Sequence, residues 1–127
     1  MVTEIMLVAA GGAVGCVCRY GMEHLEWFAD KVYHTVLINV IGCLLMGVLW
    51  TVIDRCAGNS SSLWSRLLVT GLLGGFTTFS AFSLHPVLMM RSGQWIEAVG
   101  YVTITLAGGF AACAMGMYAA EKIIRAI

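Results

Sequence analysis

Four stretches of the chain carry no charged residue over a length that suits a lipid bilayer. They cover 5–18, 32–53, 67–90 and 98–120. A helix needs about 20 apolar residues to cross the hydrocarbon core. The last three stretches reach that length, and the first reaches it if Arg19 lies at the interface or faces protein. The pattern predicts an all-α integral membrane protein, a single domain over 1–127 with four spanning helices. The predicted spans are about 4–22, 32–53, 66–90 and 96–120.

Composition agrees with a membrane protein. Of the 127 residues, 60% are hydrophobic and only 11% are charged, against about 25% charged in typical soluble domains. The net charge is zero, so the chain has no basic surface for nucleic acid. Its sequence contains no ATP-binding motif, metal-binding cluster or nucleophile constellation, so we expect no enzyme activity. Tryptophans near the span ends predict an aromatic belt; they are Trp27, Trp50, Trp64 and Trp95.

The distribution of basic residues predicts a weak preference for orientation. With four spans, both termini lie on one side of the membrane. The basic residues on that side are Arg55, Arg66, Lys122 and Arg125, and those on the other side are Lys31, Arg91 and Arg19. Orientation follows an excess of Lys and Arg on the cytoplasmic side, and this excess is small. We therefore expect dual topology, with two copies packed antiparallel; the alternative is one orientation set by a single charge or by lipid.

Small residues recur at four-residue intervals along three of the predicted spans. Gly11 and Gly15 form one pair, Gly71 and Gly75 form another, and a third series follows Gly108 to Gly116. In lipid, such residues allow helix backbones to approach closely. They predict tight helix packing.

The polar residues inside the spans are neutral. No Asp, Glu or Lys lies in the middle of a span, which argues against the alternative class, a small proton-coupled multidrug antiporter. Such an antiporter needs a carboxylate deep in the membrane. The neutral groups are Asn39, Thr70, those from Thr77 to Ser83, Tyr101, Thr103 and Thr105. Hydroxyls and the amide nitrogen can donate hydrogen bonds to an anion.

The third span contains residues that weaken a helix. Gly74 and Gly75 are adjacent, Thr77 and Thr78 are adjacent, and Pro86 follows. Glycine and proline disfavour helix interiors. The sequence predicts a break between about Gly75 and Pro86; the alternative is a kink. Broken helices at membrane depth persist where protein or water satisfies the freed backbone, and in transporters they bind ions.

Two phenylalanines follow the predicted break. Phe79 and Phe82 are three residues apart, so in a helix they share a face. The edge of an aromatic ring is electropositive and can approach a small anion in a dry pore. The alternative interpretation is core packing.

The residues from Gly71 to Ser83, with the core GGFTTFSAF, resemble the Fluc (CrcB) family of small fluoride channels. Two supporting stretches are similar to family motifs: GCVCRY at 15–20 in the first span and TVLINVIG at 35–42 in the second. Tyr101 and Thr105 lie where the fourth span of the family carries a tyrosine and hydroxyls. The resemblance covers essentially the whole chain.

The resemblance implies a passive, fluoride-selective channel that exports cytoplasmic fluoride across the plasma membrane of a prokaryote. It implies an antiparallel homodimer with two pores and a structural sodium ion on the dimer axis. The implied pore residues are Asn39, Phe79, Phe82, Ser80, Ser83, Tyr101 and Thr105. Arg19 would lie at an aqueous vestibule, and the carbonyls of Gly74 and Thr77 from both subunits would bind the sodium.

The chain departs from the family pattern at two positions. His85 stands where the family usually has a glutamate, and Ala81 replaces a hydroxyl residue. His85 could donate to fluoride or make the flux depend on pH; the alternative is a structural histidine at the interface. The replaced glutamate also leaves open a non-conducting half of a heterodimeric channel.

Overall fold

The computed structural model describes residues 1–26 and 30–127, so the predicted belt residue Trp27 lies outside the described residues. The helical segments are α1 (Val2–Glu23), α2 (Lys31–Cys56), η1 (Gly58–Ser60), α3 (Ser61–Trp64), η2 (Ser65–Leu73, a π-helix), α4 (Gly74–Phe76), α5 (Phe79–Arg91) and α6 (Trp95–Ala126). Within the described part, four stretches are long and apolar enough to span a membrane: α1, α2, the run from η1 to α5, and α6. The predicted all-α membrane architecture with four spans is confirmed.

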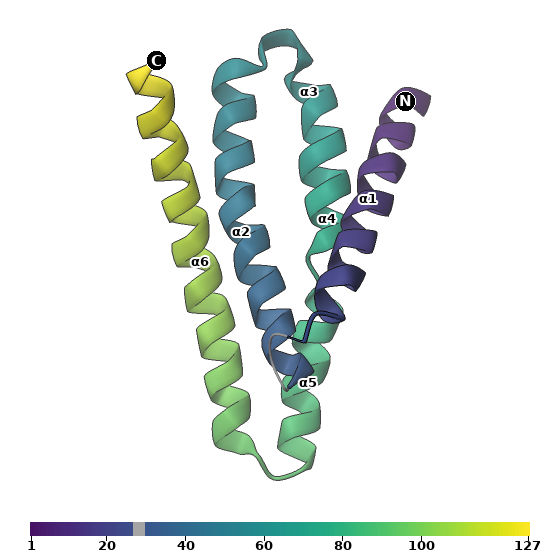
Figure 1. Ribbon diagram of the computed structural model, residues 1–127, viewed down its shortest axis with the longest axis vertical. Coiled ribbons are helices and arrows are strands. Elements are labelled where there is room, and N and C mark those ends of the chain that lie inside the picture. Colours follow the sequence, from purple (N-terminus) through teal and green to yellow (C-terminus); the bar gives the residue numbers. More distant parts are fainter. Residues whose placement is uncertain (27–29) are drawn as a thin grey trace.

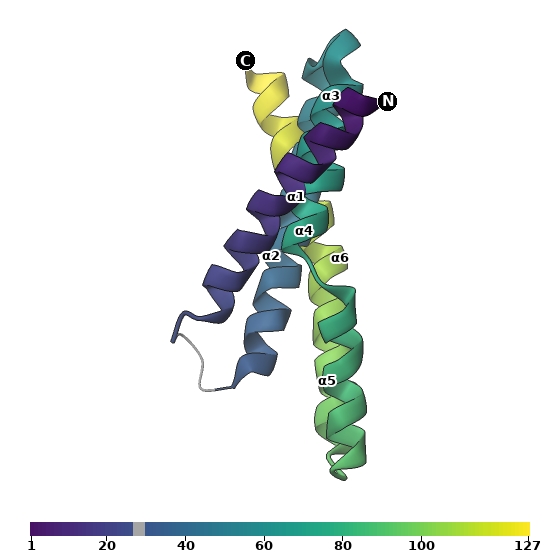
Figure 2. The same ribbon diagram turned by 90° about the vertical axis from the view of Figure 1, so that its right-hand side faces the viewer.

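The four spans place both chain ends at the same end of the bundle. Figure 1 shows the N-terminus, the C-terminus and the η1–α3 connection together, with the α5–α6 turn at the opposite end. α2 packs along α6, whereas α1 packs on η2 and α4. Below the break, α5 packs against α6. Figure 2 shows α1 and α5 diverging in that lower half.

Glycines set the close approach of the helices. Gly11 and Gly15 of α1 face the backbone oxygens of Leu67 and Leu72 in η2. Gly75 faces α1 in return, and a Cβ there would lie 3.1 Å from the Cα of Gly12. These contacts confirm the predicted packing role of the first two glycine pairs. In lipid, such backbone contact replaces the hydrophobic driving force that is missing between apolar helices.

A second glycine-mediated contact joins α2 and α6. Gly47 of α2 lies against the carbonyl of Cys113, and Gly116 of α6 lies against the carbonyl of Leu44. The buried stripe on α6 passes through Gly109 and Gly116. Gly108, the predicted first member of this stripe, is only half-buried. The offset of one residue arises because the helical period is 3.6 residues rather than four.

The third span is broken after α4. Thr77 (φ −80°, ψ 157°) and Thr78 (φ −142°, ψ 111°) are extended, and the helix restarts at Phe79. This confirms the predicted break and places it near the start of the predicted range. Pro86 does not cause it, because α5 continues through Pro86 to Arg91. Thr78 caps the new helix: its hydroxyl oxygen accepts from the backbone N–H of Ala81 at 3.3 Å, as threonine often does at a helix start.

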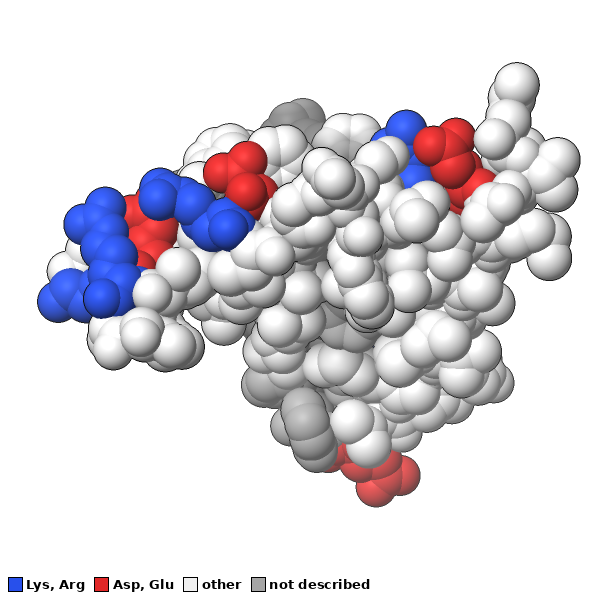
Figure 3. Space-filling model, turned by 90° about the horizontal axis from the view of Figure 1, so that it is seen from above, with Lys and Arg blue, Asp and Glu red and all other residues white. Residues whose placement is uncertain are grey.

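Charged residues gather at the margins of the end that carries the termini. Figure 3, a view onto that end, shows blue and red side chains in adjacent groups with white residues between them. Arg55 pairs with Glu121 at 3.4 Å, and Arg66 pairs with Glu4 at 3.6 Å. Both pairs are solvent-accessible and so contribute little to stability. Their position fits a membrane–water interface.

Candidate functional site

Two side chains from other helices hold the backbone of the break. The Nδ2 of Asn39 donates to the carbonyl of Thr78 at 3.1 Å, and the N–H of Thr78 donates to the Oδ1 of Asn39 at 2.9 Å. The Nη1 of Arg19 donates to the carbonyl of Thr77 at 3.2 Å. A backbone group freed inside a membrane must find a partner. Thus α2 and α1 supply hydrogen bonds that the interrupted helix has lost.

The amide of Asn39 can hold the break and still bind a ligand. An asparagine NH₂ group carries two hydrogens, and the bond to Thr78 uses one of them. Asn39 also lines a groove between α2, the break and α6. The second hydrogen can therefore be donated to a species in that groove.

The groove has a volume of about 300 Å³ and mainly apolar walls. Its lining residues are Asn39, Gly42, Cys43, Met46, Thr77, Thr78, Phe79, Phe82, Thr105, Leu106, Gly109, Phe110 and Cys113. Among these residues of the described chain, none is an acid or a base. The groove therefore offers neutral donors without a fixed charge that would trap an ion.

A row of rings runs from the groove into the protein. The centroids of Phe79 and Phe82 lie 5.6 Å apart, and Phe82 stacks on Tyr101 at 5.8 Å. His85 meets Tyr101 edge-on at 6.0 Å. Because Phe79, Phe82 and His85 are three residues apart, they share one face of α5. The row begins at Phe79, which is 78% exposed, and reaches Tyr101, which is 6% exposed.

The structure brings together only some of the residues singled out from sequence. Asn39, Phe79, Phe82 and Thr105 line one groove, and Tyr101 adjoins it through Phe82. The hydroxyl of Thr105 donates to the carbonyl of Tyr101 at 2.7 Å. This hydrogen bond within α6 uses the hydroxyl proton of Thr105. The resemblance had implied that Thr105 is a pore residue.

The two serines lie elsewhere. The hydroxyl of Ser83 donates to the carbonyl of Phe79 at 3.0 Å, within α5. Ser80 is exposed, and its hydroxyl lies 3.2 Å from that of Thr78. Neither serine belongs to the groove lining. Their predicted role as pore donors stays a prediction.

Gly74 begins the short helix α4, Thr77 follows its last residue, and Arg19 of α1 reaches Thr77. Gly74 is exposed, and a Cβ built there meets only the carbonyl of Val69, at 3.9 Å. The Thr77 carbonyl accepts from Arg19. Arg19 also lies 3.9 Å from Glu23, and 29% of its side chain is exposed. The guanidinium thus joins the break to the accessible end of α1.

Sequence reasoning did not assign several residues of the groove and the ring row to the site, among them Thr78, Thr35 and Phe110. Thr78 forms the helix cap and bonds to Asn39; its signal is a threonine directly before an apolar helical run. Thr35 forms a hydrogen bond to His85 at 3.1 Å. Phe110 lines the groove and is 75% exposed. Thr35 begins the TVLINVIG stretch of the second span, but that motif does not show its partner. Phe110 has no local signal, because its place in the groove comes from helix packing.

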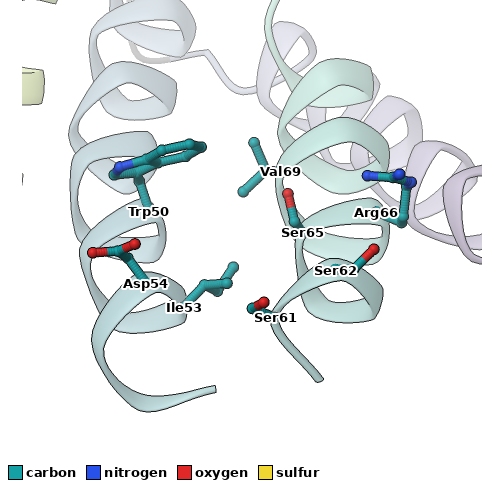
Figure 4. Close-up of a pocket in the computed structure, with 8 residues that line it drawn as sticks. All are labelled: Trp50, Ile53, Asp54, Ser61, Ser62, Ser65, Arg66 and Val69. Atoms are coloured by element: carbon teal, nitrogen blue, oxygen red, sulfur yellow. The ribbon is translucent and has the colours of Figure 1, made fainter. Parts of the chain in front are cut away.

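A second cavity, of about 260 Å³, lies between α2 and the α3–η2 helix near the terminal end. In Figure 4, Trp50 points toward Val69, and Ser65 faces the same gap. Arg66 also lines this cavity, and its guanidinium pairs with Glu4. None of the residues that the resemblance assigns to the pore or to the sodium site lines this cavity.

Comparison with known proteins identifies the family of the chain. The profile of the family described as "CrcB-like protein, Camphor Resistance (CrcB)" matches residues 6–117. The chain belongs to the CrcB family. The match includes the break, the groove and all residues of the ring row.

Relatives in this family align over nearly their full length. A protein of Caulobacter sp. (strain K31) is 40% identical over 124 residues, covering 95% of this chain and 97% of the relative. A protein of Chloroflexus aurantiacus (strain J-10-fl) is 39% identical, covering 90% and 92%. One from Leptospira interrogans (serovar copenhageni) is 34% identical, covering 91% and 92%. Each is named "Fluoride-specific ion channel FluC".

Proposed function

We propose that this chain forms a fluoride-selective channel that lets cytoplasmic fluoride leave the cell passively. The observation that carries the proposal is the groove at the break, where the Asn39 amide and the rings of Phe79 and Phe82 meet without a charged group. The names of the CrcB relatives support the same function. The chain is a channel, not an enzyme.

The chemistry of the groove suits fluoride. Fluoride is small and strongly hydrated, so a pore must replace its water with compact donors. The free hydrogen of the Asn39 amide is one donor, and the electropositive edges of Phe79 and Phe82 are others. Because these groups are neutral, they bind the ion without trapping it, as conduction requires.

The alternative of a proton-coupled antiporter lacks its essential group. Such a transporter needs a carboxylate that releases a proton when the cation binds. The groove lining that the structure describes contains no carboxylate. Neutral donors favour an anion over a cation.

We infer that the working unit is an antiparallel pair of identical chains. Thr70, Gly74 and Ser80 are exposed along the third span, although lipid cannot satisfy polar groups at membrane depth. A second copy would cover them and would close the open side of the groove beside Phe79. One chain contains the Asn39 amide, the Phe pair and the broken helix, so two copies suffice for two pores.

We place a structural sodium ion between the two breaks, held by the carbonyls of Gly74 and Thr77 from both copies. Gly74 and Thr77 lie in the last turn before the break. The last carbonyls of a helix have no partner within it, and the helix dipole is negative there. Gly74 is open to a neighbour. The Thr77 carbonyl also accepts from Arg19, and a carbonyl has two lone pairs. A bound sodium would fix the two broken helices together.

The proposal predicts fast fluoride efflux from liposomes that contain this chain alone, with little chloride efflux. Phe79→Ile removes a ring edge while keeping an apolar side chain of similar reach. We expect it to lower the fluoride rate at least about tenfold, since one lost interaction of about 1.4 kcal/mol has that effect. A fluoride electrode measures the rate, and protein-free liposomes give the leak.

Three outcomes would contradict parts of this proposal. Equal rates of chloride and fluoride efflux would show that the channel is not selective for fluoride. Fluoride efflux through the Phe79→Ile variant at the parent rate would show that the ring edge of Phe79 does not contact the ion. If flux appeared only after adding a second, different chain, the homodimer would give way to a heterodimer.

The antiparallel pair predicts mixed orientation in the membrane. A reactive cysteine tag added after Ile127 should be labelled from both sides of the cell membrane, in comparable amounts. The physical reason is the small difference in Lys and Arg between the two ends. The control is the same tag with three lysines added beside it, which should shift labelling to the cytoplasmic side. Labelling of the unmodified tag from one side only would exclude dual topology.

A further inference from the structure

Three sulfur-containing side chains line the groove beyond Asn39. Cys43 and Met46 lie on α2, and Cys113 lies on α6. Cys43 and Met46 follow Asn39 by four and seven residues, so the three share one face of α2. From Asn39, α2 runs toward the end of the bundle that carries the termini (Figure 1). The sulfur atoms therefore occupy the part of the groove between Asn39 and that end.

Backbone contact between α2 and α6 brings Cys43 and Cys113 together. A Cβ on Gly109 of α6 would lie 3.2 Å from the Sγ of Cys43, and Gly47 of α2 lies against the carbonyl of Cys113. The two cysteine side chains are close enough to interact electrostatically. Both thiols are free and half-buried. Helix packing thus places two thiols and a thioether in one groove, although they are scattered in the sequence.

We propose that Cys43, Met46 and Cys113 bind a soft monovalent cation, Cu⁺ or its analogue Ag⁺, and that the bound ion closes the groove to fluoride. Thiolate and thioether ligands select such soft ions. The metal site itself is independent of the proposed function, whereas its effect on flux rests on the proposed fluoride channel.

The binding step leaves no net charge in the groove. One cysteine thiol releases its proton to water, and its sulfur binds the cation, so that R–SH and Cu⁺ give R–S–Cu and H⁺. The other thiol and the thioether of Met46 each donate a sulfur lone pair and keep all their atoms. Copper stays Cu⁺, so the step needs no oxidant. The charges of the thiolate and the ion cancel, which matters because an isolated charge is costly in apolar surroundings.

The donor set does not suit the commoner metal ions. Zinc in structural sites takes four ligands from Cys, His and carboxylates, and the described part of the chain holds no group of even three such residues. Magnesium and calcium take oxygen ligands. A monovalent soft ion is satisfied by two or three sulfur ligands, which is what the groove offers.

A bound ion would obstruct the groove beside the Asn39 amide. Cys43 lies one turn from Asn39, and the groove measures only about 300 Å³. Sulfur ligands from α2 and α6 would tie the two walls together at that point. An ion that conducts must bind weakly enough to leave, and a metal–thiolate bond is too strong for that. We therefore expect the cation to block the channel and not to pass through it.

The binding experiment titrates the detergent-purified protein with Ag⁺, which needs no reductant. The solution contains no chloride, because silver chloride is insoluble. The three exposed cysteines are replaced by alanine, so that only the groove thiols remain; they are Cys16, Cys18 and Cys56. Calorimetry should show one tightly bound silver ion per chain. Two tight ions of equal affinity per chain would overturn the proposal, since independent thiols would each take one.

Variants in the same background test each ligand. Cys43→Ala and Cys113→Ala should each weaken Ag⁺ binding by about a hundredfold or more, since a second ligand held in place acts as an intramolecular one. Met46→Leu keeps the size of the side chain and should weaken binding to a smaller extent. The matched control is Met115→Leu on α6, whose side chain is 65% exposed and outside the groove lining; it should bind as the parent does. Unchanged affinity in both cysteine variants would overturn the shared site.

The flux experiment uses liposomes with the same three-alanine chain. Free Ag⁺ is buffered by excess methionine at about ten times the dissociation constant of the groove site. Fluoride efflux should then fall about tenfold from the rate before silver is added, since a site at that concentration is roughly nine-tenths occupied. Excess dithiothreitol, a dithiol that removes Ag⁺, should restore the rate. Cys43→Ala and Cys113→Ala should each keep most of their own rates at the same Ag⁺ concentration.

The two measurements separate this inference from the channel itself. Equal block of the parent and both cysteine variants, or tight silver binding without any change in flux, would overturn closure of the groove by the bound ion. Absence of fluoride efflux before silver is added would contradict the proposed channel. The calorimetric titration would still decide in that case whether the three sulfur atoms form a metal site.

Discussion

The Asn39→Asp variant should lose fluoride flux by about two orders of magnitude or more. Aspartate keeps the oxygen that accepts from the N–H of Thr78, but it loses the hydrogens that Asn39 donates to the Thr78 carbonyl and to the groove. It also introduces a negative charge where fluoride passes. Two like charges 4 Å apart repel by about 4 kcal/mol at an effective dielectric constant of 20. That energy corresponds to roughly a thousandfold lower occupancy.

Liposome efflux measures this effect, with Asn59→Asp as the matched control. Asn59 is exposed in η1 at the end of the bundle, so the same change of residue there should leave flux unaltered. Elution as a single species from a sizing column would show that Asn39→Asp remains folded. Conduction by Asn39→Asp at close to the parent rate would show that Asn39 only supports the break.

The second large effect is structural: Gly15→Ala should separate α1 from the third span. A Cβ on Gly15 would collide with the carbonyl of Leu72 and would lie 2.8 Å from the backbone nitrogen of Phe76. Backbone atoms cannot move aside as a flexible side chain can. Overpacking of this kind destabilises a protein by about 1–3 kcal/mol. Since Arg19 lies one turn further along α1, we also expect its bond to Thr77 to lengthen.

Thermal unfolding in detergent, followed by loss of the folded peak on a sizing column, measures the effect. Gly21→Ala is the control on the same helix, because no described atom lies within 4 Å of a Cβ built there. That substitution should be neutral or slightly stabilising, since alanine favours helix more than glycine does. Equal unfolding temperatures for the two variants would show that close backbone contact at Gly15 is unimportant.

Both predictions concern contacts that join distant parts of the sequence. Asn39 and Thr78 are 39 residues apart, Arg19 and Thr77 are 58 apart, and Thr35 and His85 are 50 apart. The type of each residue was visible from the sequence. Its partner depends on how far one helix is shifted and rotated against another. That register is set by backbone contact at glycines such as Gly15 and Gly47.

The hydroxyl residues illustrate a second limit of the sequence. Ser83 and Thr105 appear as donors to a pore because they are polar and lie within spans. In the structure each donates to a carbonyl four residues earlier in its own helix, an alternative always open to serine and threonine. The choice between this local bond and a ligand depends on the surroundings of the side chain.

The sequence by itself determined the four spans, the side shared by the termini and the region of the break. These features are local: they follow from runs without charge, from span length and from adjacent helix-weakening residues. It also determined that Phe79 and Phe82 share a face, because their spacing matches the helical period. The tertiary structure decided that the break falls at Thr77 and Thr78, and that Pro86 leaves α5 intact. It did so because Asn39 and Arg19 provide the hydrogen bonds that an interrupted helix requires in a membrane, and only the packing of the other helices brings those side chains within reach.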